Sequence, residues 1–193
     1  LCFIGVAEAS YAMYGPDSDD DSGSNAVAMY QIDGNFSFLE IGSGTEIITD
    51  TAQIMASSDS TDITGLNVVG FQITTSHTDN EQPCNFIANT QDDEVGYEGG
   101  IGDSIVADSG TQQNLVSEAY FINSTLVGER TTNSKSAIAS LLDGGDMGIG
   151  TYDFTISVVV NSGGSAICQN GDEDESVDWT VSLITLEYTL TEV

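Results

Sequence analysis

The chain is 193 residues long, and only two of its residues are basic against 31 that are acidic, so its formal net charge is −29. A chain without a basic patch cannot neutralise phosphates, which excludes nucleic acids and anionic membrane surfaces as partners and disfavours phosphorylated substrates. Salt screens the repulsion between the carboxylates, and the screening length falls from about 10 Å at 0.1 M salt to about 3 Å at 1 M. We therefore expect the surface of a halophilic or marine protein, with site-specific binding of Ca²⁺ as the alternative.

The rest of the composition indicates a folded, extracellular chain that is rich in strands. Hydrophobic residues make up 39% of it, which is too much for a disordered chain. The polar residues are mainly Ser, Thr, Asn, Gly and Asp, which favour strands and turns over helices. No apolar run approaches the length of about 18 residues that a membrane-spanning helix needs. Because the chain begins with Leu1, its first residues are either the remainder of a signal peptide or anchor, or a mature N-terminal arm.

An apolar arm is expected in residues 1–15, as a donor strand or as a short helix that ends at Gly15-Pro16. Residues 16–25 form an acidic linker, and residues 26–193 form a single β-sandwich domain. Left in water, the arm would expose several large apolar side chains together, so we expect it to contact a neighbouring subunit. These side chains belong to Leu1, Phe3, Ile4, Val6, Tyr11 and Met13.

Alternation of apolar and polar residues predicts strands through much of the remaining chain. In residues 26–41 the apolar side chains fall on even numbers, and Asp33-Gly34 offers a hairpin or bulge in the middle. The acidic region 78–109 has weak periodicity, and we expect loops there with one short strand near Phe86. Further strands are predicted at 46–55, 66–75 and 115–127.

One short helix is expected, at residues 133–142. Asn133 or Ser134 would cap its first turn, because a side-chain oxygen there can accept from a free backbone N–H. Gly144-Gly145 would end it, because glycine adopts the left-handed conformation that closes many helices.

The last third of the chain has the clearest alternation. Residues 151–160 place their apolar side chains on even numbers, from Tyr152 to Val160. In the final segment the apolar residues fall on odd numbers up to Leu183 and on even numbers from Ile184, which predicts a β-bulge inside that strand. We expect the two segments to pair as a long antiparallel hairpin, joined by the acidic loop 162–176.

About seven to nine short strands separated by turns predict an all-β fold, an antiparallel β-sandwich or jelly roll. Residues 148–154, with the sequence GIGTYDF, resemble the tyrosine corner at which a late strand of immunoglobulin-like domains begins. The cysteine that follows in antibody domains is absent, because Phe154 stands in its place. The resemblance therefore implies the sandwich architecture of this stretch and no activity.

Two acidic clusters are candidate calcium sites, and Ca²⁺ is the only cofactor that we expect. The first spaces its carboxylates at alternate positions, as calcium loops do, but Ser22 and Ala28 stand where an EF-hand needs glycine and glutamate. The second lies in the acidic loop before the final strand, and residues 92–94 form a third acidic group. The candidate ligands are Asp17, Asp19, Asp21, Asp172 and Asp174.

Cysteines and sequons fit a secreted protein. Cys84 and Cys168 both lie in polar, loop-like surroundings, so we expect a disulfide between them, with reduced thiols as the alternative. Asn35 and Asn123 each begin an Asn-Xaa-Ser/Thr sequon and are candidate glycosylation sites.

An enzyme is not expected. His77 is the only histidine, and no nucleophile elbow or His/Cys cluster accompanies it for a catalytic triad or a zinc site. Paired carboxylates for glycoside hydrolysis are not excluded by composition, but such sites lie in aromatic-lined clefts. The only tryptophan, Trp179, fits a core strand instead.

A small secreted β-sandwich with a separable apolar arm and no active site resembles the subunits of archaeal surface filaments. The arm is shorter than the apolar helix of archaellins and type IV pilins, and is similar to the donor strand of strand-exchange pilins, which completes a neighbour's sheet. The resemblance implies a non-enzymatic subunit of an extracellular filament, pilus or surface layer in a saline setting. It also implies a homopolymer in which each arm enters the neighbouring subunit.

Two other functions remain open. One is a membrane-anchored extracellular β-sandwich that binds a partner, with or without Ca²⁺. The other is a jelly-roll capsid protein of a halophilic virus, in which the arm would tie capsomers together. The codons upstream of Leu1 would distinguish the three functions. A signal peptide would favour the filament, and an initiator Met would favour the capsid. A complete apolar span would favour the anchored domain.

Overall fold

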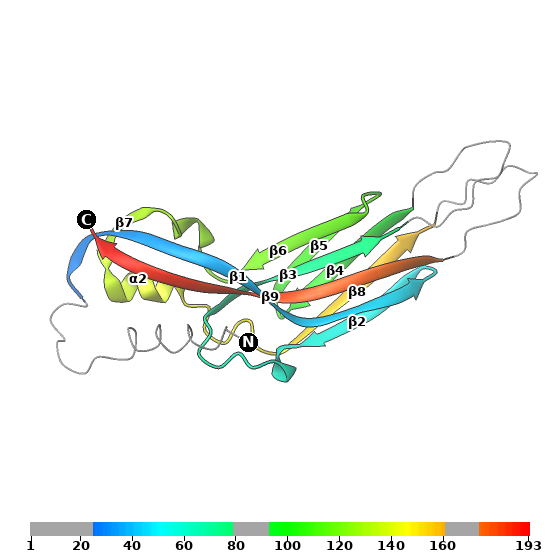
Figure 1. Cartoon of the computed structure of the whole chain (residues 1–193), viewed down its shortest axis with the longest axis horizontal. Helices are drawn as coiled ribbons and strands as arrows, with labels where there is room; N and C mark the ends of the chain where they lie inside the picture. Colours follow the sequence, from blue (N-terminus) through cyan, green and yellow to red (C-terminus); the bar gives the residue numbers. More distant parts are fainter. Residues whose placement is uncertain (1–24, 79–92, 161–173) are drawn as a thin grey trace, which may run out of the picture.

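Two antiparallel β-sheets face each other, so the predicted all-β sandwich is confirmed (Figure 1). The computed structural model describes residues 25–78, 93–160 and 174–193. These residues also contain the helix α2 (Lys135–Leu142) and the 3₁₀ turns η1 (Ser58–Ser60) and η2 (Ser124–Leu126). The strands are β1 (Val27–Ile48), β2 (Thr51–Ser57), β3 (Val68–His77), β4 (Glu94–Ile101), β5 (Ser104–Gly110), β6 (Asn114–Tyr120), β7 (Arg130–Ser134), β8 (Thr151–Val159) and β9 (Glu175–Glu192).

The strand order is that of a jelly roll. One sheet has the order β6-β3-β9-β1-β7 and the other the order β2-β8-β4-β5. Apart from β7, the strands form four nested antiparallel pairs, β4–β5, β3–β6, β2–β8 and β1–β9. A ribbon of nested pairs that wraps into two four-stranded sheets is the eight-stranded jelly roll. β7 and α2 are inserted between β6 and β8.

The predicted C-terminal hairpin is wrong, because its two strands lie in different sheets. β8 pairs with β2 and β4, whereas β9 pairs with β1 and β3. Most consecutive strands of a jelly roll cross between the sheets, with β4 and β5 as the paired exception here, so adjacency in sequence does not imply pairing. Alternation predicted the positions of both strands correctly, because it shows which face of a strand is buried. It does not show with which strand that strand pairs.

The change of parity within β9 comes from two hydrophobic cores on opposite faces of one sheet, not from a bulge in β9. Val181 and Leu183 belong to the core between the sheets, whereas Ile184 and Leu186 belong to a second core. The bulges lie in the partner strands, between Glu40 and Gly42 in β1 and between Val68 and Gly70 in β3.

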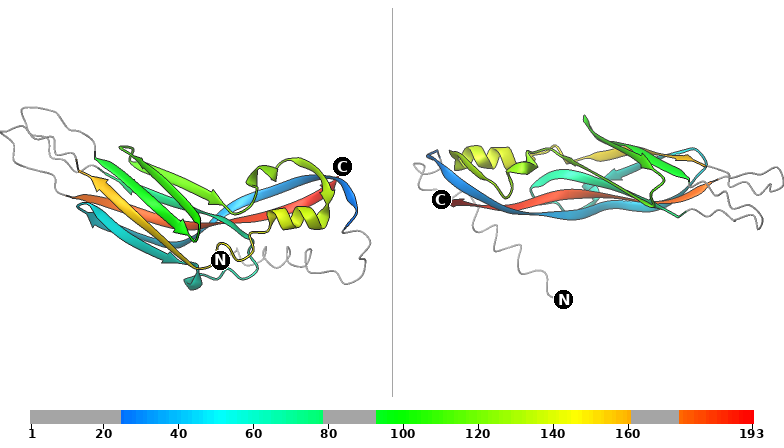
Figure 2. Two further views of the ribbon diagram at one scale, coloured as in Figure 1. Left: turned by 180° about the vertical axis from the view of Figure 1, so that it is seen from behind. Right: turned by 90° about the horizontal axis from the view of Figure 1, so that it is seen from above.

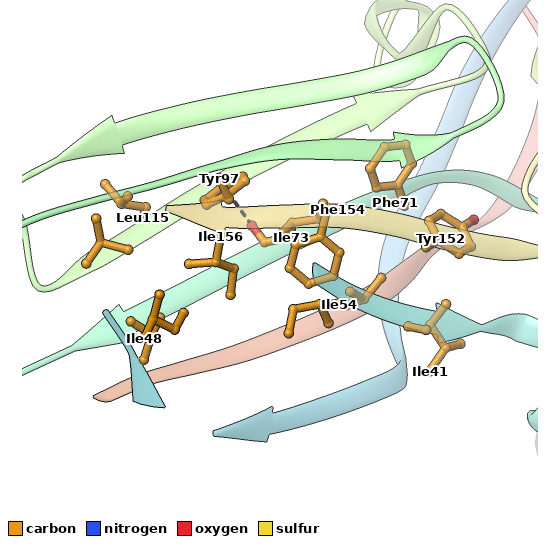
Figure 3. Close-up of a cluster of buried hydrophobic side chains, with 14 of the residues drawn as sticks. Ile41, Ile48, Ile54, Phe71, Ile73, Tyr97, Leu115, Tyr152, Phe154 and Ile156 are labelled. Atoms are coloured by element: carbon orange, nitrogen blue, oxygen red, sulfur yellow. Dashed lines mark hydrogen bonds between the residues drawn. The ribbon is translucent and has the colours of Figure 1, made fainter. Parts of the chain in front are cut away.

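The first core fills the sandwich, and Figure 3 shows a large part of it. Phe71 and Tyr152 pack edge-to-face with ring centroids 5.2 Å apart. Tyr97 satisfies its hydroxyl by donating to the carbonyl oxygen of Ile73 at 3.3 Å. The Tyr152 hydroxyl donates to the carbonyl oxygen of Gly148 at 2.8 Å, which is the contact typical of a tyrosine corner, in the stretch whose sequence resembles one.

The second core lies where β1 and β9 extend past the other sheet, and α2 covers it (Figure 2). The predicted helix is present, although it begins at Lys135 with Ser134 as its cap. The Ser134 hydroxyl accepts from the backbone N–H of Ala137 at 3.2 Å. The buried side chains of this core are Tyr30, Ile32, Val69, Ile138, Leu142, Ile184 and Leu186.

Two further sequence predictions need correction. Region 78–109 is predicted to be loops with one short strand near Phe86, which lies outside the described residues, but β4 and most of β5 lie in this region. The alternation of β4 is masked by glycines, and Gly100 is needed because a Cβ there would lie 2.0 Å from the Ser104 carbonyl oxygen and 2.8 Å from the Phe71 ring. The strand predicted at 115–127 ends at Tyr120, because the chain then turns into η2.

Candidate assembly edge

The described part of β1 has a long edge with no paired strand. β7 pairs only with Val27–Gln31, and the last bonds on this side join Ile32 to residues 128 and 129 at 2.8 and 2.9 Å. From residue 34 to residue 47, no described strand pairs with β1 on the side away from β9. At about 3.3 Å per residue, this free edge is roughly 46 Å long.

The direction of each backbone group on this edge follows from the ladder. Along a strand, successive residues direct their N–H and C=O groups to opposite sides. The backbone N–H and C=O groups of Ile32 bond on the side away from β9. The backbone groups of the even-numbered residues therefore point to this side as far as Glu40. After the bulge at Ile41, those of the odd-numbered residues do so. The outward-pointing residues are Gly34, Phe36, Phe38, Glu40, Ser43, Thr45 and Ile47.

The β1 edge is longer than the other sheet edges and only partly protected. β2, β5 and β6 have seven residues each, and β7 has five. Proteins protect edges with charges, prolines and bulges. Residues 34–47 contain one bulge, no proline and two charged residues, Glu40 and Glu46, whereas Phe38 and Ile47 expose 52% and 73% of their surface.

Trp179 covers the inner face of this edge strand. Its indole lies against Gly42 and Gly44, where a Cβ atom would come within 3.4 and 3.0 Å of the ring. On its other side the indole meets Phe154 edge-to-face, with ring centroids 5.8 Å apart. The indole N–H is buried and has no hydrogen-bond partner in the described part of the chain. An unpaired buried donor therefore lies beside the unpaired edge.

Both basic residues lie at the end of the molecule where the described chain begins and ends. Arg130 donates to the Gln31 side-chain oxygen at 3.1 Å, and the Lys135 ammonium lies 5.8 Å from the centre of the Tyr30 ring. These contacts are with neutral groups. The backbone N–H of Val193, the last residue, donates to Met29 at the same end.

Tyrosine hydroxyls in the sandwich are held in their neutral form. Burial and the neighbouring Glu118 carboxylate raise the pKa of Tyr120 to about 12. Burial alone raises the pKa of Tyr152 well above its usual range. Both hydroxyls are therefore hydrogen-bond donors throughout the neutral range, to Glu118 and to Gly148.

The opposite end of the sandwich contains buried polar residues. His77, Asp93 and Glu175 are all buried there, and the backbone N–H of His77 donates to Gln113 at 3.0 Å. Within the described residues, no group of three or more His, Cys, Asp or Glu side chains is arranged to hold a metal ion.

Few of the predicted site residues fall within the described residues. Asp174, Asn35 and Asn123 do: Asp174 is half-buried just before β9, and both asparagines are exposed. The other calcium ligands, the cysteine pair and all the arm residues lie outside the described residues. These are Asp17, Asp19, Asp21, Asp172, Cys84, Cys168, Leu1, Phe3, Ile4, Val6, Tyr11 and Met13.

Sequence reasoning did not find the β1 edge. Glycines at 42 and 44 made one strand look like two, so β1 was predicted to end at residue 41. The signal that could have found it is the single tryptophan, since a large ring in a strand needs small residues opposite. In the register, Gly44 stands opposite Trp179.

The comparisons with known proteins leave the function open. No family model and no curated protein matches the chain. One solved chain, described as Desmodium yellow mottle tymovirus, aligns with 93% of this chain and 98% of its own length. The two share 10% sequence identity, and the TM-score is 0.31. No helix in the described residues is long and apolar enough to cross a membrane.

Proposed function

We propose that this chain is a non-enzymatic structural protein of the cell exterior whose copies assemble into a filament or surface layer. The observation that carries this proposal is the open edge of β1 between residues 34 and 47. A row of unpaired N–H and C=O groups of this length is a template for another strand. Strand addition from a second chain satisfies those groups and buries the side chains that flank them.

The proposed occupant of the edge is the apolar arm of a neighbouring copy. Residues 1–14 equal residues 34–47 in number, so the two segments can pair along their whole length. Apolar side chains of the arm would cover Phe38 and Ile47, and a carbonyl oxygen near the ring could accept from Trp179. Because each copy has one arm and one edge, such contacts propagate head to tail.

The test blocks the edge without disturbing the core. Phe38→Pro removes an outward-pointing N–H and places a ring in the path of an incoming strand, and proline is tolerated on edge strands. Val116→Pro in β6 is the matched control. Both residues are about half exposed, at 52% and 51%, and both backbone N–H groups point away from their sheet.

We expect Phe38→Pro to remain a folded monomer and Val116→Pro to assemble like the parent chain. Circular dichroism would verify folding, and light scattering with electron microscopy would measure assembly. Deleting residues 1–14 should also give a folded monomer. If Phe38→Pro assembles as the parent does, copies do not join through the β1 edge.

The jelly-roll strand order favours a second candidate, a capsid protein, because shells are often built from this fold. Fold alone does not determine function. The same electron micrographs separate the candidates, since a capsid protein would form closed shells and not filaments or sheets.

A further inference from the structure

We infer that Asn123 is an N-glycosylation site and that Asn35 is not. The chain contains two Asn-Xaa-Ser/Thr sequons, at residues 35–37 and 123–125. A transferase must bind all three residues of a sequon in its own site, so the sequon has to leave its surroundings at little cost. The surroundings of the two sequons differ in this respect.

Asn123 lies in the exposed connection between β6 and β7. Asn123 and Thr125 are both exposed, and Ser124 is half-buried at the start of η2. The Asn123 side-chain oxygen accepts from the Thr125 hydroxyl at 2.7 Å, so the two side chains that define the sequon are already in contact. The Asn123 side chain accepts no capping bond from the backbone of η2. The hydrogen bonds of this sequon within the described residues all join residues no more than three positions apart.

Asn35 is exposed too, but its sequon lies in a part of β1 that is paired with β9 throughout. Asn35 stands opposite Glu187 in β9, and Ser37 stands opposite Thr185. Phe36 packs edge-to-face on Tyr120, with ring centroids 5.4 Å apart. The Ser37 carbonyl oxygen also accepts from the Thr185 hydroxyl at 3.4 Å. Extracting this sequon would break the β1–β9 ladder and open the second core.

The transfer to Asn123 requires a lipid-linked sugar phosphate or pyrophosphate as donor. The new bond joins the Asn123 amide nitrogen to the anomeric carbon of the sugar. The bond between that carbon and the phosphate oxygen breaks, and the phosphate leaves with the electron pair. One amide proton goes to the released phosphate.

The selection of one sequon has a structural consequence. A glycan on Asn123 projects from the end of the molecule that contains η2 and β7. An unmodified Asn35 leaves β1 free of a bulky group beside its open edge. The choice between the two sequons rests on their environments alone, whereas modification of either sequon rests on the exterior location that the proposed function assigns.

Glycopeptide mapping of the native protein, purified from its own cells, tests the inference. We expect carbohydrate on the peptide that contains Asn123 and none on the peptide that contains Asn35. Thr125→Ala should abolish the modification and Thr125→Ser should retain it, because both hydroxyl residues complete a sequon. Asn35→Gln should leave the carbohydrate mass unchanged.

Two results would overturn the inference. One is carbohydrate on Asn35, which would mean that transfer precedes folding and that the sheet does not protect this residue. The other is an unmodified Asn123 in the native protein. Asn123→Gln provides a second way to remove the site, and thermal melting of each variant would separate loss of a glycan from loss of the fold.

Discussion

At the scale of single residues, Tyr152 joins the start of β8 to the turn before it. Its hydroxyl is buried and donates to the Gly148 carbonyl oxygen at 2.8 Å, while its ring packs on Phe71. The contact is between residues four apart, so it fixes the turn locally and also anchors it in the first core. A buried carbonyl that loses its donor is not compensated by water.

Tyr152→Phe should therefore destabilise the fold while leaving its packing unchanged. We expect a loss of about 1–2 kcal/mol in the free energy of unfolding, measured by urea denaturation. Tyr120→Phe is the matched control, because that hydroxyl donates to the exposed Glu118 carboxylate and its loss should cost less. Equal effects of the two substitutions would contradict a special role for the tyrosine corner.

At the scale of elements, α2 is held in place by a side chain from a distant loop. Asn67 donates from its amide nitrogen to the Leu142 carbonyl oxygen at 2.7 Å and accepts from the Gly144 backbone N–H at 3.1 Å. Gly144 packs against the Val68 carbonyl oxygen, in a space that a Cβ atom would fill. The C-terminal carbonyls of a helix need such partners, because they have none within the helix.

Asn67→Ala should weaken the attachment of α2 more than it weakens the sandwich. Two partly buried hydrogen bonds are lost, at about 1 kcal/mol each. Amide hydrogen exchange should accelerate in α2, from Lys135 to Leu142, and remain slow in β3 and β8. Asn133→Ala is a suitable control, because within the described residues its side chain accepts a hydrogen bond from the adjacent Ser134 backbone N–H and not from a distant loop. Unchanged exchange in α2 would contradict this role of Asn67.

Sequence periodicity predicted where the strands of this fold lie in the sequence better than it predicted which strands pair with each other. It located β8, β9 and α2 because each buries a regular stripe of side chains, such as Tyr152, Phe154 and Ile156 in β8. It missed β4 because glycines replace side chains where strands approach closely. It interpreted the parity change in β9 as a bulge, because one sequence cannot show that a strand contacts two cores on opposite faces.

The candidate site was less predictable for a different reason. An open edge is a property of the strand order, which depends on pairings between distant segments. Nothing in residues 34–47 by itself indicates that the far side of β1 lacks a partner. The arm was predicted from the sequence because an apolar segment next to acidic residues stands out locally.

At the scale of the whole molecule, the negative charges are distributed so that no two acidic residues stand opposite each other in the described strand ladders. Each acidic residue in them stands opposite a neutral one, such as Glu118 opposite Gln72 and Asp153 opposite Met55. Like charges directly opposite would destabilise a sheet. The repulsion that remains acts over longer distances, where mobile ions can screen it.

Stability should therefore rise with salt, through screening and not through a particular ion. The net charge is −29, and the two basic residues contact neutral groups, so most of the repulsion is uncompensated within the chain. We expect the melting temperature at neutral pH to increase from low to molar NaCl, by about 2–4 °C for each kcal/mol of repulsion relieved. KCl should match NaCl, because screening depends on ionic strength.

Millimolar CaCl₂ gives the control: a saturable rise beyond that expected from its ionic strength would indicate ordered Ca²⁺ at the predicted acidic clusters. A melting temperature that stays flat in every series would show that the charge does not limit the stability of this fold.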